Sequence, residues 1–318
     1  MSTLLNRFKS TIMSEPLWGI DLGGTKTEGV ILTSIDDAIP IIRRRIDTHK
    51  EKGYGHILDN ICFLIDRMSK ESGLSPRRIG IGTPGIKDPL LHTMINCNTT
   101  ALNGRYLQSD LEKKLGIPVL LENDANCFAL AEAHWGIVKR DFPEARIVFG
   151  IIMGTGVGGA IIINKQVWAG KHGIAGEWGH NFLDESGGAC YCGKSGCVET
   201  VLSGPALENF YFKISGSHLT LKEIVCKNIS AGDAHTRAVI DRLHEFFGKG
   251  VAAVINLLDP DVIVIGGGVG NIDSLYNEGI ESIKKYIFNT RMDTPVVKPI
   301  LGDSAGVFGA AALGILHK

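Results

Sequence analysis

Residues 17–32 read Leu-Trp-Gly-Ile-Asp-Leu-Gly-Gly-Thr-Lys-Thr-Glu-Gly-Val-Ile-Leu. A short apolar run over 18–21 leads into the turn Gly23-Gly24-Thr25, and a second apolar run returns over 29–32. Two such runs joined by a glycine turn are typical of a β-hairpin. Glycines in the turn let backbone N–H groups approach an anion closely, and Thr25 and Lys26 add donors. A tight turn without a ligand is the alternative that this motif alone leaves open.

The pattern returns in the second half of the chain. Apolar residues 147–153 lead into the turn Gly154-Thr155-Gly156, and residues 159–163 return. Chance similarity between two glycine-rich hairpins is the alternative to a duplicated unit. The rest of the pattern predicts strands at 79–81, 118–121 and 261–265, and helices around 57–68, at 125–135, at 234–258 and after 302–304.

This alternation of strands and helices favours a layered α/β fold. Two copies of a unit that starts with a hairpin predict a duplicated fold with a cleft between its halves. Ligands of such sheets bind beyond the carboxyl ends of the strands, where the glycine turns lie. A third turn, Gly266-Gly267-Gly268, follows a buried strand and leaves room for a flat ring. Three such turns favour a nucleoside triphosphate site, with Asp21 placed to hold Mg²⁺ through water.

Composition narrows the class of protein. The chain has 318 residues, 44% of them apolar, and a net charge of -1, so bulk charge gives no support for a nucleic-acid or acidic-membrane surface. Five glycines interrupt the longest uncharged stretch, 147–164, which favours two strands over a membrane-spanning helix. Residues 1–14 lack the apolar run of a signal peptide. Seven cysteines, an odd number, favour a reducing compartment. We therefore expect a cytoplasmic protein with no nucleic-acid or membrane partner.

One histidine and three cysteines have the spacing of a zinc site, His180-x9-Cys190-x-Cys192-x4-Cys197. One imidazole and three thiolates suit a closed, structural Zn²⁺ site. Redox thiols or an incidental cluster are the alternatives, although Cys190 and Cys192 are too close in sequence to bridge without strain.

Two glutamates flank the zinc ligands. Glu177 lies three residues before His180, and Glu199 lies two residues after Cys197, so a metal would fix both carboxylates. Rigid carboxylates that accept hydrogen bonds from hydroxyl groups suit a sugar pocket. Trp178 lies next to Glu177. If the sugar carries an acetamido group, Trp178 is expected either to fill the space that this group needs or to stack against it.

Asn123 and Asp124 lie at a strand-to-helix junction. Capping of the helix is one interpretation, because both residue types are good N-caps. The other is that Asp124 accepts a proton from an attacking hydroxyl group while Asn123 holds a neighbouring hydroxyl. In phosphoryl transfer such a base mainly orients the nucleophile.

Taken together, these motifs resemble the ROK family of repressors and sugar kinases, within the hexokinase/actin-like ATPase superfamily. The resemblance runs from about residue 17 to the C-terminus and rests on residues 21–26, 122–126, 154–159, 176–180 and 190–199. Residues 98–104 and 176–181 look closest to the bacterial fructokinase/mannokinase branch, although the stretch from His180 to Cys190 is shorter than in that branch.

The resemblance implies a two-lobed actin-like ATPase (ribonuclease H-like) fold. An N-terminal extension, 1–16, would precede a small α/β lobe of 17–123 plus 304–318 and a large α/β lobe, 124–303, with the zinc site. It also implies ATP, Mg²⁺ and structural Zn²⁺, and frequent dimers, so we expect a homodimer.

The resemblance also implies a role for each residue that matches a functional position of the family. Asp124 resembles the catalytic base. The expected sugar-binding residues are Asn98, Asn123, Glu177, His180 and Glu199. The expected nucleotide-binding residues are Asp21, Gly23, Gly24, Thr25, Lys26, Gly154, Thr155, Gly156, Gly266 and Gly267. The expected zinc ligands are His180, Cys190, Cys192 and Cys197.

The expected function is an ATP-dependent sugar kinase acting on the C6 hydroxyl of a hexose, with fructose or mannose ahead of glucose. The sugar motifs contain no Arg or Lys, which argues against an acidic or phosphorylated sugar. An N-acetylhexosamine kinase, a glucokinase or a non-catalytic sugar sensor are the alternatives. The DNA-binding sensors of the family carry a winged-helix head, and about sixteen residues before Leu17 are too few for one, so we expect an enzyme.

Overall fold

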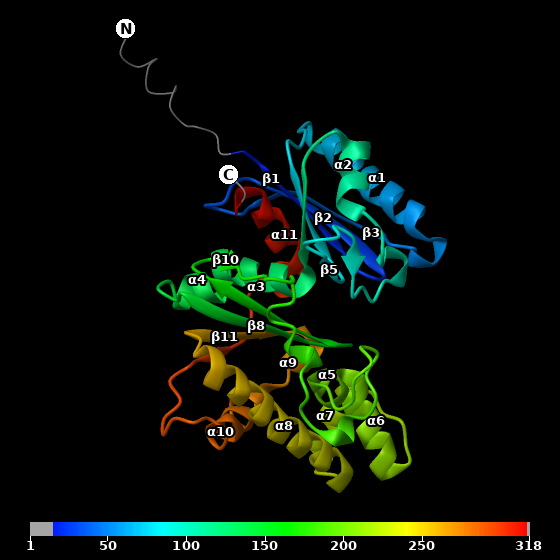
Figure 1. Ribbon diagram of the computed structural model, residues 1–318. Helices are drawn as coiled ribbons and strands as arrows, with labels where there is room; N and C mark the ends of the chain where they lie inside the picture. Colours follow the sequence, from blue (N-terminus) through cyan, green and yellow to red (C-terminus); the bar gives the residue numbers. More distant parts are fainter. Residues whose placement is uncertain (1–14, 317–318) are drawn as a thin grey trace. The chain divides into compact units, whose positions relative to one another are not determined.

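The structure is a computed structural model that describes residues 15–316, apart from the side chains of residues 230, 231 and 316. Residues 1–14 of the predicted N-terminal extension lie outside the described residues. The described chain divides into two compact units (Figure 1). One unit comprises residues 15–87, 93–122 and 310–316, and the other comprises Asp88–His92 and Asn123–Gly309.

The first unit is built on a five-stranded sheet of order β3-β2-β1-β4-β7. Strand β1 pairs antiparallel with β2 and parallel with β4, which confirms the predicted hairpin at the Gly23-Gly24-Thr25 turn. A two-stranded ribbon, β5-β6, lies outside this sheet. The strands are β1 (Leu17–Leu22), β2 (Lys26–Leu32), β3 (Pro40–Asp47), β4 (Ile79–Thr83), β5 (Ile86–Lys87), β6 (Met94–Ile95) and β7 (Val119–Asn123).

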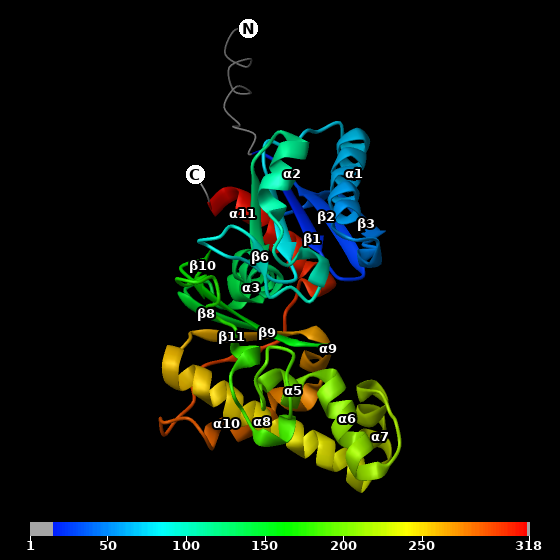
Figure 2. The ribbon, with the colours of Figure 1, turned by 45° about the vertical axis from the view of Figure 1, so that its right-hand side comes forward.

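Helices cover both faces of this sheet. Figures 1 and 2 show α1 (Tyr54–Ser72) and α2 (Leu107–Leu115) on one face and the end of α11 (Ala305–Leu316) on the other. The buried residues of α1 are the predicted apolar face: Ile57, Leu58, Ile61, Leu64, Ile65 and Met68. A Cβ atom on Gly80 of β4 would lie 1.8 Å from the Ala310 carbonyl oxygen, so only glycine lets α11 pack this closely.

The second unit repeats the sheet. Its order is β10-β9-β8-β11-β12. When the strands of each sheet are numbered along the chain, both sheets have the order 3-2-1-4-5, with the third strand at one edge and the fifth at the other. Strand β8 pairs antiparallel with β9 and parallel with β11. The predicted duplication is thus confirmed. The strands are β8 (Ile147–Met153), β9 (Val157–Ile163), β10 (Gln166–Val167), β11 (Val262–Gly266) and β12 (Val296–Val297).

Two helix layers enclose the second sheet. Figure 2 shows α3 (Asp124–His134) on one face and α8 (Ala234–Leu258) on the other. Helix α8 has the predicted bounds and ends where Asp259 adopts a left-handed conformation before Pro260. The other helices are α4 (Ile137–Asp141), α5 (Val198–Leu202), α6 (Gly204–Ser215), α7 (Leu221–Ala231), α9 (Gly267–Gly270) and α10 (Glu278–Lys284).

Each unit has its own hydrophobic core. The core of the first unit lies between its sheet and helices α1 and α2, and that of the second lies between its sheet and helices α5 to α8 and α10. Within residues 15–316, no helix combines the length and apolar character needed to cross a membrane.

Candidate active site

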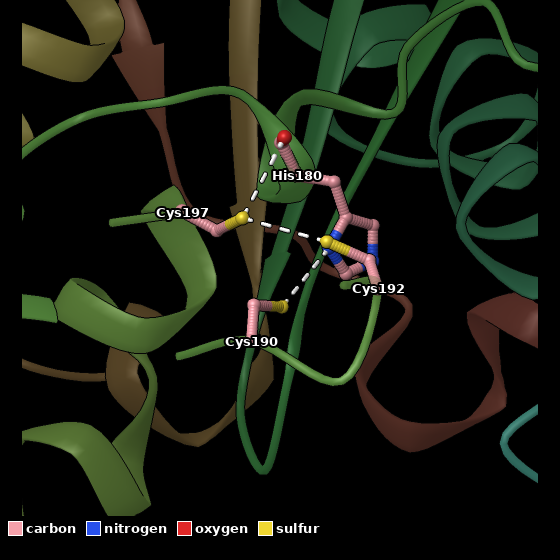
Figure 3. A group of neighbouring side chains, drawn as sticks. All are labelled: His180, Cys190, Cys192 and Cys197. Carbon is pink, nitrogen blue, oxygen red and sulfur yellow. Dashed lines mark hydrogen bonds between the residues drawn. The ribbon is translucent and has the colours of Figure 1, made fainter. Parts of the chain in front are cut away.

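Four side chains of the second unit converge in the way that the sequence predicts for a metal site. Figure 3 shows four side chains that point toward one another, those of His180, Cys190, Cys192 and Cys197. Each offers one possible ligand atom, and these four atoms all lie within 4.8 Å of one another. The Cys192 and Cys197 sulfur atoms are 3.6 Å apart, and Cys190 Sγ lies 3.6 Å from His180 Nδ1. Zn–S bonds of about 2.3 Å at tetrahedral angles require sulfur atoms roughly 3.8 Å apart. The cluster therefore fits Zn²⁺.

The ligands come from three short segments. His180 ends the 3₁₀ turn Trp178–His180, Cys190 and Cys192 belong to a loop closed by a bridge between Ala189 and Ser195, and Cys197 caps α5. With so little regular structure in these segments, hydrogen bonds and metal binding are the expected means of holding them together.

Glu199 joins this loop region to the second glycine turn. Its Oε2 atom accepts a hydrogen bond of 3.0 Å from the Val157 N–H, at the start of β9. A Cβ atom on Gly156 would lie 2.5 Å from the same oxygen, so glycine at 156 leaves space for this carboxylate. The sequence predicted that Glu199 would face a ligand but gave no sign of its contact with the turn.

Glu177 precedes the 3₁₀ turn and is half-buried. Burial raises the pKa of its carboxyl group, His180 opposes this shift, and the charge of Glu199 adds to it. The charge of Glu177 also acts on Asp124. Three carboxyl groups of the second unit, those of Asp124, Glu177 and Glu199, are thus linked in one chain of electrostatic interactions.

The structure separates the roles of Asn123 and Asp124. Asn123 is the N-cap of α3, and its side-chain oxygen accepts a hydrogen bond of 2.9 Å from the Ala125 N–H. Asp124 is the first helical residue, and one of its oxygens accepts from the same N–H at 2.8 Å. Capping therefore explains Asn123 but does not by itself explain Asp124.

Asp124 is exposed at the start of α3. Desolvation by the surrounding protein raises its pKa to about 6, and the charge of Glu177 contributes, although hydrogen bonds from Ala125 and Asn123 favour the ionised form. A carboxylate touched by water still loses hydration when protein atoms occupy much of the volume around it. A carboxyl group with a pKa near 6 suits general-base catalysis at neutral pH.

The third glycine turn borders a cavity of about 1000 Å³ in the second unit. Gly268 lines it, together with residues of α7, α8 and the turn after α9. Gly266 and Gly267 have other neighbours, because added Cβ atoms would lie 2.7 Å from the Phe128 ring and 2.2 Å from the Met153 carbonyl oxygen, respectively. Of the three glycines of this turn, Gly268 is the one that lines the cavity.

The second glycine turn lies next to this cavity. A Cβ atom on Gly154 would be 3.9 Å from the Gly268 nitrogen. The Gly154 N–H donates to the Gly156 carbonyl at 2.9 Å, which closes the turn, and Thr155 at its tip is exposed. The turn and the cavity are thus arranged as neighbouring sites in one unit.

The remaining predicted residues belong to the first unit. The Gly23 N–H donates to the Lys26 carbonyl at 3.0 Å and closes the first turn. Gly24 borders open space, with Thr99 Oγ1 and Lys50 Nζ at 3.6 and 3.7 Å from the position of an added Cβ. The other predicted residues of this unit are Asp21, which is half-buried, and Thr25, Lys26 and Asn98, which are exposed.

Trp178 does not have the role expected for it. Its indole N–H donates a 3.1 Å hydrogen bond to the Gly250 carbonyl, and its ring packs edge-on against Phe149. The side chain is buried in the core of the second unit. It therefore neither fills nor stacks against an acetamido pocket, because its surface is already covered by protein.

The chain is similar to known proteins along nearly its whole length. Residues 17–316 match the model of the ROK family. The N-acetyl-D-glucosamine kinase of Aliivibrio fischeri is 34% identical over 94% of this chain and 99% of its own length.

Solved structures show the same fold. A ROK hexokinase from Thermus thermophilus superposes with a TM-score of 0.84 at 29% identity, covering 96% of this chain and 100% of its own. A ROK family glucokinase from Streptomyces griseus, in complex with glucose and AMPPNP, gives a TM-score of 0.76 at 27% identity, covering 94% and 99%.

Proposed function

Because the chain belongs to the ROK family and is a sugar kinase, we propose that it transfers the γ-phosphate of ATP to the C6 hydroxyl of N-acetyl-D-glucosamine. The observation that carries the proposal is the carboxyl group of Asp124. Its pKa of about 6 makes it mostly ionised at pH 7, and it lies within electrostatic reach of Glu177 in the unit that also holds the metal cluster.

The choice of sugar rests on the relatives. The Aliivibrio fischeri protein, similar over nearly the whole chain, is an N-acetyl-D-glucosamine kinase, which supports this sugar as the first candidate. Fructose and mannose, favoured by the resemblance at residues 98–104 and 176–181, become the second candidates. Glu177 and Glu199 suit either class, because both carboxylates accept hydrogen bonds from neutral hydroxyl groups.

In the proposed reaction, Asp124 accepts a hydrogen bond from the sugar hydroxyl and takes its proton as the phosphoryl group is transferred. The transition state of such reactions is loose, so the carboxylate acts chiefly by orienting the nucleophile. The Ala125 N–H donates to an oxygen of Asp124 as well as to Asn123, and this bond orients the Asp124 carboxylate at the start of α3. Mg²⁺ bound with ATP would neutralise phosphate charge, and Asp21 is the residue proposed to hold it.

The adenosine of ATP is proposed to occupy the cavity at Gly268, with its phosphates beside the Gly154-Thr155-Gly156 turn. The adjacency of Gly154 and Gly268 supports this placement. Zn²⁺ held by His180, Cys190, Cys192 and Cys197 would supply structural stability to the loops that carry Glu177 and Glu199.

A sugar panel tests the function. We expect ATP-dependent phosphorylation, with kcat/KM for N-acetyl-D-glucosamine at least tenfold above that for fructose, mannose, glucose and N-acetyl-D-mannosamine, measured at one saturating ATP concentration by coupled ADP release. A tenfold lead of fructose or mannose would reverse the ranking. A chain that phosphorylates none of these sugars would contradict the proposed function.

Replacing Asp124 by Asn tests the base. We expect kcat to fall at least ~100-fold with little change in sugar affinity, because the amide keeps the shape of the carboxyl group but accepts no proton. In the wild type, kcat/KM should fall tenfold per pH unit below about 6, since the raised pKa places protonation of the base there. Asp233→Asn at the N-cap of α8 is the matched control. Near-normal turnover of Asp124→Asn would show that Asp124 is not the base.

Elemental analysis tests the metal. We expect about one zinc ion per chain in the wild type and little in Cys192→Ser. Loss of the metal should lower the melting temperature and weaken sugar binding together, because metal binding is coupled to folding of the loops that carry both glutamates. Cys226→Ser, at an exposed cysteine outside the cluster, is the control. Zinc-free protein with unchanged melting and sugar binding would contradict this expectation.

A bulky side chain at Gly268 tests the nucleotide site. An added Cβ there meets nothing within 4 Å, so Gly268→Phe should fold normally and extend into the cavity. We expect KM for ATP to rise at least ~10-fold while binding of sugar alone is unchanged. Gly55→Phe, where an added Cβ is equally free, is the control. An unchanged KM for ATP would place the nucleotide elsewhere.

A further inference from the structure

Two polar side chains beside the first glycine turn have no role in the function proposed so far. Apart from its chain neighbours, an added Cβ atom on Gly24 would meet two atoms of the described residues within 4 Å, Thr99 Oγ1 at 3.6 Å and Lys50 Nζ at 3.7 Å. All three residues belong to the first unit. A hydroxyl group, an ammonium group and a bare backbone position therefore lie side by side.

The hydroxyl group of Thr99 is buried but has no hydrogen-bond partner among residues 15–316. Thr99 is 2% exposed, and although it is the N-cap of the 3₁₀ turn Thr100–Leu102, its side chain makes no capping bond. A buried hydroxyl group without a partner destabilises a protein relative to an apolar side chain of the same shape. Folding therefore does not explain a threonine here, whereas a ligand beside Gly24 would.

The ammonium group of Lys50 forms no ion pair with any residue of the described range 15–316, although Glu51 follows it directly. The Glu51 carboxylate lies 3.3 Å from His49 Nδ1 instead. Lys50 is exposed and begins the 3₁₀ turn Lys50–Lys52. Because a lysine side chain is long and flexible, its charged end can move to admit a ligand while the Gly24 backbone stays in place.

The loop that carries Thr99 is held by the side chain of Asn103. This amide accepts a hydrogen bond of 2.9 Å from the Cys97 N–H and donates one of 3.1 Å to the Cys97 carbonyl. The Asn98 N–H also donates to the Pro84 carbonyl at 3.2 Å. A donor that is fixed before binding stabilises developing charge better than one that must first be ordered.

The chemistry of these groups favours an anion. An ammonium group donates hydrogen bonds and accepts none, and lysine binds phosphate as a point charge. Thr99 directly follows Asn98, which is expected to bind the sugar, and Gly24 belongs to a turn that is expected to bind phosphate. The phosphoryl group that passes from ATP to the sugar is the anion that belongs beside both.

We propose that Lys50 and Thr99 bind this phosphoryl group during its transfer, Lys50 through its ammonium group and Thr99 through its O–H. The inference rests on the proposed function and adds two residues to it. In that reaction the sugar oxygen forms a bond to the γ-phosphorus, the bond from this phosphorus to the β–γ bridging oxygen breaks, and the electron pair leaves with ADP. Asp124 takes the hydroxyl proton, and Lys50 and Thr99 donate hydrogen bonds to the phosphoryl oxygens without transferring a proton.

Lys50→Met removes the charge and keeps a long side chain. We expect kcat to fall about 100-fold, because the variant loses a donor to the charge of the transition state, with KM for the sugar changed less than threefold. The inhibition constant of N-acetyl-D-glucosamine 6-phosphate, the expected product, should rise about tenfold. Lys52→Met, on the same 3₁₀ turn and equally exposed, is the matched control and should leave all three values unchanged.

Thr99→Val keeps the shape of the side chain without the hydroxyl group. We expect kcat to fall at least ~10-fold while the melting temperature stays the same or rises, because valine leaves no buried hydroxyl unpaired. A threonine with a merely structural role would not combine lower activity with equal or higher stability. Thr99→Ser, which keeps the hydroxyl group, should retain kcat within about threefold.

The outcomes separate this inference from the proposed function. All measurements use the sugar that leads in the panel and its 6-phosphate. Wild type that phosphorylates a sugar together with near-normal kcat in either Lys50→Met or Thr99→Val would overturn the inference alone, as would a lower melting temperature of Thr99→Val. Wild type that phosphorylates none of the sugars would overturn the proposed function and the inference with it.

Discussion

The hydrogen bond from the Val157 N–H to Glu199 connects the two chemical parts of the second unit. On one side of it lies the turn that precedes β9, and on the other lie α5 and the loop with the cysteines. A buried or half-buried carboxylate is stable only when its oxygens accept hydrogen bonds, so the contact fixes the distance between the turn and the cluster. Glycine at 156 leaves room for this arrangement, because an added Cβ atom would lie 2.5 Å from the Glu199 Oε2 atom and the carboxylate would have to shift. The bond therefore ties Glu199, and with it the loop of the Cys/His cluster, to the second glycine turn.

The neighbouring residues Asn123 and Asp124 have different roles at the start of α3. Asn123 performs the structural task of capping, which leaves the neighbouring carboxylate of Asp124 exposed at the first helical position. A helix N-terminus favours the ionised form of this carboxyl group, whereas desolvation and Glu177 favour the protonated form. These opposing effects give Asp124 a pKa of about 6. The carboxyl group is therefore mostly ionised at neutral pH but binds a proton more readily than an ordinary aspartate does. The environment therefore suits Asp124 to general-base chemistry.

Local patterns predicted the fold well, because hairpins, the buried face of α1 and the end of α8 at Asp259 depend on neighbouring residues. Contacts between distant segments were not predictable. Strand β3 was missed because Arg43 and Arg45 give it the charge of a loop, and only the structure shows both paired with the buried Glu28 of β2. The burial of Trp178 depends on Gly250 in α8, and the cavity at Gly268 is lined by residues of four helices, α7 to α10. The spacing was sufficient to predict that the four side chains of the cysteine cluster converge, because they all lie within residues 180–197.

The glycines of the three turns fall into two physical groups. At Gly23, Gly156 and Gly267, an added Cβ would lie under 3.0 Å from protein atoms, so packing alone accounts for the absence of a side chain. At Gly24, Gly154 and Gly268, an added Cβ would meet no protein atom closer than 3.6 Å. Packing does not explain this second group, and none of the three has the positive φ that would require glycine. Open backbone of this kind is what the proposed nucleotide site requires, because phosphate and adenosine groups would approach it without meeting a side chain. In the proposed function, each turn therefore combines a glycine whose side-chain space is filled by protein with one that would be left open to the nucleotide.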